Sequence, residues 1–365
     1  MRILVVNAGS SSLKLRVLDD QDGLEASADL PALGDQRPGQ LDEAVAGFGS
    51  VDAVGHRVVH GGTDFTDPVV VNDEVRARLG HLADLAPLHQ PPALDALDAV
   101  ARLLPMVPEV ACFDTAFHAT LPAEAATYAL PAEWRQRYGI RRYGFHGLSH
   151  SYASRRAAQL VEPPRPGGFR VVTCHLGAGA SLAAVVGGRC ADTTMGFTPL
   201  EGLVMATRSG TVDPGLVLWL QTHAGLSAEE VTNALEHRSG VSGLAGTSDM
   251  ATVITDAGRG EAGAALALGV YLHRLRASVA AMTASLGGLD ALVFTGGVGE
   301  NAPVVREGAA DGLRFLGIGV DHGRNGGAVP DCDVTSTGSA VQVLVVRARE
   351  DLEIARGVRA LLGGR

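Results

Sequence analysis

The sequence lacks the features that mark secreted, membrane-spanning and nucleic-acid-binding proteins. The longest apolar stretch, Ala262 to Val270, contains glycine and is too short to span a bilayer. Met1 leads into an apolar segment without the charged region of a secretory signal. Runs of lysine and arginine are absent and the formal net charge is −10, so we expect neither a nucleic acid nor an anionic membrane as a partner.

Cysteine is scarce, and its spacing argues against two common frameworks. The cysteines form no CxxC pair and lie far apart in the chain, at Cys112, Cys174, Cys190 and Cys332. This spacing is typical of small buried side chains in a reducing compartment, and not of a disulfide or zinc framework. The sequence therefore predicts a soluble cytoplasmic protein.

Hydrolase and zinc-site signatures are missing as well. No serine stands in a G-x-S-x-G elbow with a partnered histidine and aspartate. His56 and His60 have i,i+4 spacing, as do His146 and His150, but each pair lies in an extended or glycine-containing segment. Zinc ligation by either pair is therefore a disfavoured alternative, because the helical geometry that would aim both rings at one ion is missing.

The chain holds ample apolar material for packed interiors. Of its 365 residues 46% are hydrophobic, which excludes disorder and, at this length, favours two domains over one. Predicted strands cover 51–54, 109–113, 291–294 and 341–346, and predicted helices cover 73–85, 93–104, 151–160, 215–222, 228–236, 263–286, 304–313 and 350–362. Residues 19–50 predict a variable loop with a short helix near 42–46, and residues 119–150 are expected to be irregular. The proline-containing segment 86–92 is expected to be non-helical.

The N-terminal stretch from Met1 to Lys14 predicts a β-hairpin with an unusual tip. An apolar run, Ile3 to Val6, is followed by small residues and then by alternating apolar and basic residues. The tip, Asn7 to Lys14, offers mainly backbone N–H groups, hydroxyls and one lysine, so an anion could approach it closely. A surface hairpin with a plain glycine–serine turn is the alternative interpretation.

This pattern recurs later in the chain. A strand over 169–175, a small-residue turn from Leu176 to Ser181 and a strand over 182–186 repeat the opening hairpin. The repeat suggests duplicated domains whose two tips could hold the ends of a polyphosphate; coincidence between two ordinary hairpins is the alternative. A third glycine-rich turn, 295–301, lies between a strand and a helix, which is a nucleotide-approach geometry.

Charged and polar side chains stand at strand ends and in glycine-rich turns, and they suit phosphoryl transfer. They are Asn7, Lys14, Arg57, Asp114, His146, His175, Arg208 and Glu350. That reaction needs arginines and backbone cradles around a transferring phosphoryl group, together with Mg²⁺. Asn7 and Glu350 are candidate oxygen ligands or second-layer partners for Mg²⁺. For each arginine, a structural ion pair remains the alternative.

Taken together, these motifs resemble the acetate kinases, a family within the acetate/sugar kinase–Hsp70–actin superfamily. The resemblance covers nearly the whole chain and is weakest in residues 19–50. The matching strings occur in family order at Asn7–Lys14, Gly55–Gly62, Leu85–His89, Phe113–His118, Tyr143–Gly147, Gly196–Gly202 and Phe294–Asn301.

The resemblance implies an α/β fold of two duplicated ribonuclease H-like (actin-like ATPase) domains, with mixed central sheets flanked by helices and an active site in the interdomain cleft. It implies an acid-kinase domain over 1–118 plus 352–365, and a nucleotide-binding and dimerisation domain over 119–351. The implied activity is reversible, ATP-dependent phosphorylation of acetate to acetyl phosphate by direct in-line transfer, with Mg²⁺ or Mn²⁺. The implied assembly is a homodimer joined through the C-terminal domain.

The resemblance also implies roles for individual residues. Asn7 and Glu350 would serve the metal, and Arg57 and Arg208 would hold the carboxylate and the transferring phosphoryl group. Asp114 would orient Arg208 or the metal's waters, and His146 and Arg208 would stabilise the transition state. The substrate pocket would comprise Arg57, Val59, Leu88 and Pro199. The ATP site would comprise Lys14, His175, Leu176, Gly177, Ala178, Gly179, Asp249, Met250, Ala251, Gly297, Val298, Gly299, Glu300 and Asn301.

Two departures from the family pattern affect the nucleotide side. The second phosphate turn usually reads His-Leu-Gly-Asn-Gly, and Ala178 stands here where the family has Asn. The adenine-side segment usually reads Asp-Phe-Arg, and this chain has Ala251 in place of the Arg. We therefore expect a kinase with weakened or altered phosphoryl-donor use. A kinase for propionate or another short-chain acid, and a weakly catalytic nucleotide-binding protein on an actin-like scaffold, are the alternatives.

Overall fold

The computed structural model describes residues 1–9, 12–83, 86, 90–161 and 168–363. The chain divides into two units. The first comprises 1–119, 145–152 and 349–365, and the second comprises 120–144 and 153–348. Compared with the expected division, the first unit also includes residue 119, the segment 145–152 and residues 349–351.

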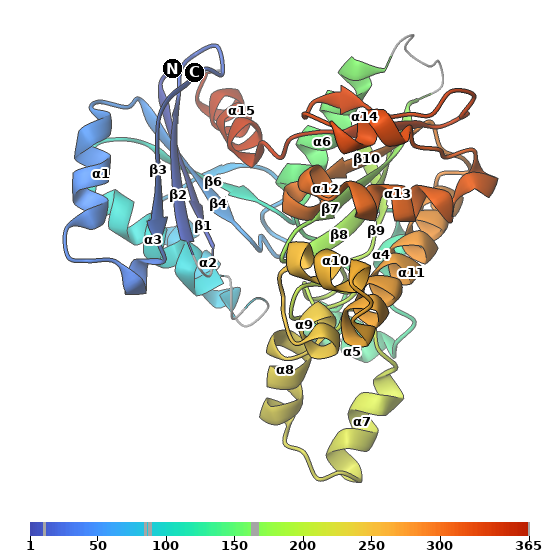
Figure 1. The fold of residues 1–365 in the computed structure, drawn as a ribbon. Coiled ribbons are helices and arrows are strands. Elements are labelled where there is room, and N and C mark those ends of the chain that lie inside the picture. The colour runs from blue at the N-terminus through green and yellow to red at the C-terminus, as the bar shows by residue number, and fades with distance from the viewer. Residues whose placement is uncertain (10–11, 84–85, 87–89, 162–167, 364–365) are drawn as a thin grey trace. The chain divides into compact units, whose positions relative to one another are not determined.

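The first unit is built on a six-stranded mixed sheet (Figure 1). Its strands are β1 (Ile3–Ala8), β2 (Ser12–Leu18), β3 (Leu24–Pro31), β4 (Ala53–Val58), β5 (Val69–Val70) and β6 (Glu109–Phe113). The spatial order is β3-β2-β1-β4-β6-β5. β1, β4 and β6 run parallel, whereas β2, β3 and β5 are each antiparallel to a neighbour. The predicted opening hairpin is confirmed as β1 and β2, and its residues 10–11 lie outside the described residues.

Helices cover both faces of this sheet, which explains the unbroken apolar run in β1. Leu4 and Val6 pack with α1 (Gln40–Phe48) and α3 (Gln90–Leu103) on one face. Ile3 and Val5 pack on the other face with α15 (Glu350–Leu362). The unit also contains α2 (Asp73–His81) and the short 3-10 helix η1 (Leu33–Asp35), and the 3-10 helix η3 (Ala116–Thr120) ends one residue beyond it.

The second unit repeats this sheet topology. Its strands are β7 (Arg170–Leu176), β8 (Ala180–Val186), β9 (Arg189–Thr193), β10 (Ala291–Thr295), β11 (Cys332–Asp333) and β12 (Gln342–Val345). The order β11-β12-β10-β7-β8-β9 is that of the first sheet read from its other edge. β7, β10 and β12 are parallel, and β8, β9 and β11 are antiparallel to a neighbour. The predicted second hairpin and the duplicated α/β design are thus confirmed.

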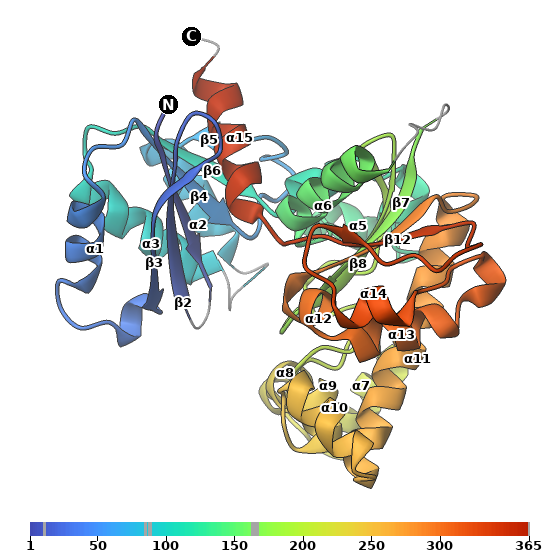
Figure 2. The same ribbon diagram turned by 45° about the horizontal axis from the view of Figure 1, so that its top comes forward.

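The second unit is richer in helices (Figure 2). They are α4 (Ala123–Ala126), α5 (Ala132–Tyr138), α7 (Pro214–Thr222), α8 (Ala228–His237), α9 (Gly240–Ala245), α10 (Met250–Gly258), α11 (Ala262–Ser285), α12 (Gly296–Asn301), α13 (Pro303–Asp311), η4 (Arg314–Leu316) and α14 (His322–Gly326). α6 (Gly147–Leu160) begins in the first unit and ends in the second. None of the described helices combines the length and the apolar character needed to cross a membrane.

Within residues 19–50, the short helix expected near 42–46 is confirmed as part of α1, but the loop expected before it is wrong, because it contains the strand β3. β3 is an edge strand whose side chains alternate between exposed and half-buried positions. Its acidic and small residues give little apolar signal. Pairing with β2 supplies the hydrogen bonds that its composition does not predict.

Helices also occur in segments that were expected to be non-helical. α3 begins at Gln90 and includes Pro91 and Pro92, although 86–92 was predicted to be non-helical. A proline in the first helical turn is tolerated, since N–H groups there have no partner within the helix. The glycine-rich turn 295–301 is likewise largely the helix α12, and α4 and α5 interrupt the segment expected to be irregular.

Candidate active site

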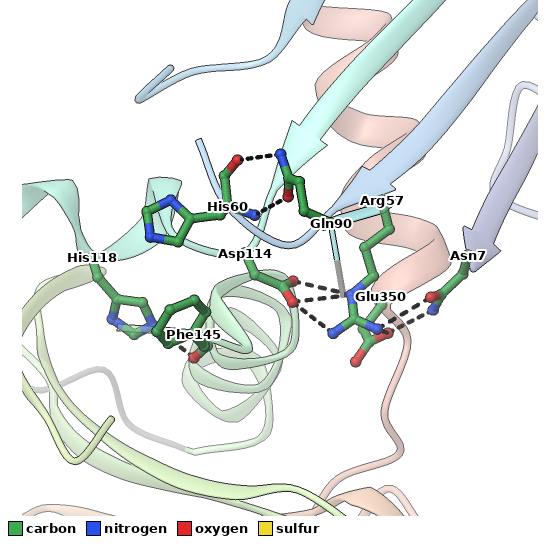
Figure 3. A network of polar contacts seen from close by, with 8 residues as sticks. All are labelled: Asn7, Arg57, His60, Gln90, Asp114, His118, Phe145 and Glu350. Atoms are coloured by element: carbon green, nitrogen blue, oxygen red, sulfur yellow. Dashed lines mark hydrogen bonds and ion pairs between the residues drawn. The ribbon is translucent and has the colours of Figure 1, made fainter. Parts of the chain in front are cut away.

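Four polar residues from separate elements of the first unit form one network (Figure 3). Asn7 lies near the end of β1, Arg57 on β4, Asp114 directly after β6, and Glu350 at the start of α15. The carboxyl ends of parallel strands meet at one sheet edge, which is where α/β folds usually place active-site groups. This topology brings together residues that are far apart in the sequence.

Asp114 holds the guanidinium of Arg57. Arg57 Nη2 donates to Asp114 Oδ2 at 2.6 Å, and Nε donates to Oδ2 at 3.0 Å and to Oδ1 at 3.2 Å. Asp114 is 1% exposed, so this pair is largely withdrawn from water. A bidentate pair of this kind fixes both the position and the plane of the guanidinium.

Asn7 links Arg57 to Glu350. Its Oδ1 accepts a hydrogen bond from Arg57 Nη1 at 3.2 Å, and its Nδ2 donates to Glu350 Oε2 at 2.8 Å. Arg57 Nη1 also lies 3.9 Å from Glu350 Oε2. The network thus places one fixed cation beside two carboxylates and an amide, a set suited to an anion and a hard metal ion.

The electrostatics of this network favour a permanently charged Arg57. Burial acts to lower the pKa of the guanidinium, but the carboxylates of Asp114 and Glu350 outweigh it and raise that pKa overall. Burial also raises the pKa of the Asp114 carboxyl above its usual range, with Arg57 opposing this rise and Glu350 adding to it.

His146 occupies a strained position beside Asp114. Its φ of 55° lies in the left-handed region, which costs a residue other than glycine on the order of 1 kcal/mol. The next residue, Gly147, donates its N–H to the Asp114 carbonyl at 2.9 Å. A Cβ at Gly147 would lie 2.0 Å from that carbonyl oxygen, so only glycine permits the approach. Strain held in this way is common at functional sites.

Two buried histidines and the buried Gln90 lie close to this network (Figure 3). Gln90 accepts a hydrogen bond from the His60 N–H at 3.1 Å and donates to the His60 carbonyl at 3.1 Å. His118 Nε2 donates to the Phe145 carbonyl at 3.0 Å, directly before His146. Sequence reasoning missed Gln90 because its segment was expected to be a proline-broken connection.

A cavity of about 560 Å³ lies in the second unit. Its lining includes eight residues of the predicted ATP site: Gly177, Ala178, Asp249, Met250, Ala251, Gly297, Val298 and Asn301. The remaining lining is mostly small or aliphatic, and no lysine or arginine occurs among the described residues that form it. The cavity therefore suits a nucleoside better than a polyphosphate.

Several residues predicted for the ATP site are not part of this lining. His175, Leu176 and Gly179 belong to the second hairpin, and Lys14 is exposed on β2 as the register partner of Asn7. Gly299 is buried next to β7.

Glu300 also stands apart from the cavity lining. Its Oε1 accepts from Gly296 N at 3.1 Å and from Ala348 N at 2.9 Å, a structural arrangement. Arg306, which the sequence did not single out, is 1% exposed and binds the carbonyls of Gly299 and Glu300. A buried arginine of this kind leaves no local sequence signal.

The predicted acid-binding residues are only partly described. Val59 is buried just after β4, and Leu88 lies outside the described residues. In the second unit, Arg208 Nη1 donates to the Pro199 carbonyl at 3.3 Å. Burial lowers the pKa of Arg208, with Glu236 opposing. Within the described part of the chain, no group of three or more His, Cys, Asp or Glu side chains could hold a metal ion.

Comparison with known proteins gives the family of the chain. The Acetokinase family matches residues 40–356. The chain belongs to this family. An acetate kinase from Clavibacter michiganensis subsp. michiganensis is 45% identical over 394 residues, covering 99% of this chain and 99% of that protein.

Solved acetokinase structures share the fold. A propionate kinase from Francisella tularensis subsp. tularensis aligns with a TM-score of 0.90 and 35% identity, covering 98% of both chains. An acetate kinase from Porphyromonas gingivalis aligns with a TM-score of 0.89 and 35% identity, covering 99% of both chains. The expected family, enzyme class and fold class are therefore confirmed, whereas the roles of individual residues stay predictions.

Proposed function

We propose that this acetokinase catalyses the reversible, ATP-dependent phosphorylation of acetate to acetyl phosphate. The observation that carries the proposal is Arg57, a partly buried cation held in one orientation by Asp114 and flanked by Asn7 and Glu350. The Clavibacter and Porphyromonas acetate kinases support acetate as the acceptor.

In the proposed reaction, a carboxylate oxygen of acetate attacks the terminal phosphorus of ATP in line with the departing ADP oxygen. The new P–O bond to acetate forms as the P–O bond to ADP breaks. Arg57 and Arg208 bind the acid and the equatorial phosphoryl oxygens, and His146 donates a hydrogen bond to the charge that develops there. Asp114 acts on Arg57, whose orientation it fixes.

Asn7 and Glu350 would hold Mg²⁺ or Mn²⁺. Their amide and carboxylate oxygens are hard donors, and two protein ligands suffice for an ion that keeps most of its waters. When bound, the ion neutralises charge on the phosphate oxygens. The hydrogen bond from Asn7 Nδ2 to Glu350 Oε2 holds both side chains at one place.

The cavity in the second unit would take the adenosine of ATP. Its lining of small and aliphatic residues matches a nucleoside, and the phosphates would be approached by Lys14, His175 and the turns that follow β1 and β7. Ala178 and Ala251 contribute no polar side-chain atom to this lining. This supports the expectation of weakened or altered donor use.

Propionate is the second candidate acceptor, favoured by the similarity to the Francisella propionate kinase. One methylene changes binding by about 1–3 kcal/mol, so a pocket built from Val59, Leu88 and Pro199 would discriminate only modestly between the two acids.

We also propose that the protein is a cytoplasmic homodimer joined through its second unit. Helix α7 supports the interface, because Leu216, Leu218 and Trp219 are exposed on it. Clustered exposed apolar side chains of this kind mark interaction surfaces. Sedimentation equilibrium would give a dimer mass, and Leu218→Glu would give a monomer.

A hydroxamate assay tests the proposed function. Acetate, propionate and butyrate would each be incubated with ATP, GTP or pyrophosphate, and acyl phosphate would be trapped by hydroxylamine. We expect most product from acetate with ATP. If propionate gave more product than acetate, propionate would be the preferred acceptor. If no pair gave acyl phosphate, the proposed reaction would be wrong and only a nucleotide-binding role on this fold would remain.

A further inference from the structure

The loop between β9 and α7 carries two of the predicted site residues but has no regular structure. Residues 194–213 contain neither helix nor strand, and they include Pro199 and Arg208. Some of its backbone groups bond to other backbone groups, as the Ala206 N–H does to the Ala178 carbonyl at 3.1 Å and the Ser209 N–H to the Leu235 carbonyl at 3.0 Å. Other backbone groups of the loop are held by side chains. These side chains therefore contribute to where Arg208 lies.

Glu201 lies at the centre of a polar cluster on this loop. The Tyr128 hydroxyl donates to Glu201 Oε2, and Arg142 Nη2 donates to Oε1 at 2.9 Å. The Arg142 guanidinium also lies 5.4 Å from the centroid of the Tyr128 ring. Burial, and then the bond to Glu201, raises the pKa of Tyr128, so its hydroxyl stays a donor at neutral pH.

Tyr128 and Arg142 also bind the loop backbone directly. Arg142 Nη1 donates to the carbonyls of Thr194 at 3.2 Å and Met195 at 3.1 Å. The N–H of Phe197 donates to the Tyr128 hydroxyl at 3.0 Å. Both side chains come from the segment 120–144, so the start of the loop is fixed from outside it.

Gly196 shows how closely the loop packs on this cluster. A Cβ at this position would lie 1.7 Å from Glu201 Oε2 and 2.0 Å from the Tyr128 hydroxyl, so any side chain would displace them. The Gly196 carbonyl in turn accepts from the Tyr143 N–H at 3.0 Å. The start of the loop is thus in close contact with the cluster.

The cluster has a direct structural link to Arg208. Arg208 Nη1 donates to the carbonyl of Pro199, which stands two residues before Glu201 in the chain. We propose that Tyr128, Arg142 and Glu201 are positioning residues that set the orientation of Arg208 for phosphoryl transfer. The proposal rests on the function proposed above, in which Arg208 binds the transferring group.

Tyr128→Phe and Arg142→Lys test the proposal. The first removes one hydroxyl and keeps the ring, and the second keeps the charge but cannot bind a carboxylate and two carbonyls together. We expect kcat of acyl-phosphate formation to fall about 10–100-fold, because small misplacements of a catalytic group have effects of this size. The KM for ATP should change by less than about threefold, since the loss lies in transition-state binding.

Arg170→Lys is the matched control. Arg170 also binds a carboxylate and a carbonyl in the second unit, through Asp290 at 3.0 Å and Gly287 at 3.1 Å, away from the loop. Arg170→Lys should lower the melting temperature by about as much as Tyr128→Phe and Arg142→Lys do, and it should leave kcat unchanged. Unchanged kcat in both test variants, or an equal loss in Arg170→Lys, would overturn the proposal.

Limited trypsin digestion supplies a measurement that does not depend on activity. Cleavage after Arg208 should be faster in Tyr128→Phe and Arg142→Lys than in the wild type, and unchanged in Arg170→Lys. If the wild type formed no acyl phosphate, the proposed function would fail, and faster cleavage would still support loop positioning. Unchanged cleavage in both test variants would contradict the positioning role.

Discussion

At the residue scale, the most informative position is His146, whose backbone is strained beside Asp114. Asparagine adopts positive φ more readily than histidine, so His146→Asn should keep or slightly raise the melting temperature. Without the imidazole, kcat should fall about 10²-fold if the ring stabilises developing charge. Steady-state kinetics and thermal unfolding on one preparation would check both, and a wild-type kcat in this variant would remove His146 from the mechanism.

Ala178 offers a gain-of-function test on the nucleotide side. It lines the 560 Å³ cavity, and an asparagine there would add an amide donor near the phosphate-facing turn. A hydrogen bond to a charged group is worth about 1.5–3 kcal/mol, so Ala178→Asn should lower the KM for ATP about tenfold or more. An ordinary ATP KM in the wild type, unchanged by the substitution, would contradict the expected weakening of donor use.

At the element scale, α15 carries Glu350 into the site and depends on close packing over β4. A Cβ on Gly55 would lie 2.6 Å from Ile354 Cγ2 and 2.8 Å from Val358 Cγ2. Gly55→Ala should therefore displace α15, lower the free energy of unfolding by about 1–3 kcal/mol and reduce kcat. Urea denaturation and kinetics would measure the two effects.

Gly80→Ala is the control for that experiment. Gly80 lies in α2, where an added Cβ makes only an ordinary contact at 3.5 Å with Arg76. Alanine should stabilise this helix by up to about 1 kcal/mol and leave kcat unchanged. If Gly55→Ala behaved in the same way, the account of α15 as the support of Glu350 would be wrong.

Element by element, the sequence predicted best where burial was strongest. The apolar runs of β1, β6, β7 and β10 and the pattern of α15 are close to their observed bounds. β3 was missed because it is an exposed edge strand, which is stabilised by pairing with β2 and carries no apolar pattern. The start of α3 was missed because the prolines were taken as helix breakers, although they stand in the first turn.

At the scale of the whole molecule, two buried histidines should make the fold acid-sensitive. Burial lowers the pKa of His60 and His118 to about 4 from 6.5, with the Phe145 carbonyl partly opposing this at His118. As the pH falls, these two histidines are therefore protonated at a higher pH in the unfolded chain than in the folded chain. The stability that each neutral ring contributes is complete above about pH 6.5 and is lost as the pH falls towards about 4.

The free energy of unfolding should therefore fall by up to about 3 kcal/mol per histidine over this range. Urea denaturation of the wild type and His118→Gln, from about pH 7 to about pH 4.5, would measure it. The variant should show a shallower fall. Parallel curves for the two proteins would show that His118 does not titrate in this way.

Across the molecule, the candidate site could be predicted only in part. The motifs identified Asn7, Arg57 and Asp114, and Glu350 was singled out as a charged residue at the start of the last predicted helix. The structure places these four residues in one network. Their mutual contacts were not predictable. Asp114 was expected to face Arg208 or the metal's waters, whereas in the structure its carboxylate binds Arg57. Supporting residues such as Arg306 and Gln90 carry no local pattern, because only the folded chain gives them their partners.

The central claim is that Arg57, held by Asp114, promotes transfer of phosphate from ATP to acetate. Its most direct test is ³¹P NMR of ATP and acetate with the wild type, Arg57→Ala and the control Arg76→Ala, which removes a more exposed arginine–aspartate pair in the same unit. We predict acetyl phosphate equal to the ADP formed with the wild type and Arg76→Ala, and a rate at least about 10²-fold lower with Arg57→Ala. Acetyl phosphate formed by Arg57→Ala at the wild-type rate, or by none of the three proteins, would contradict the account.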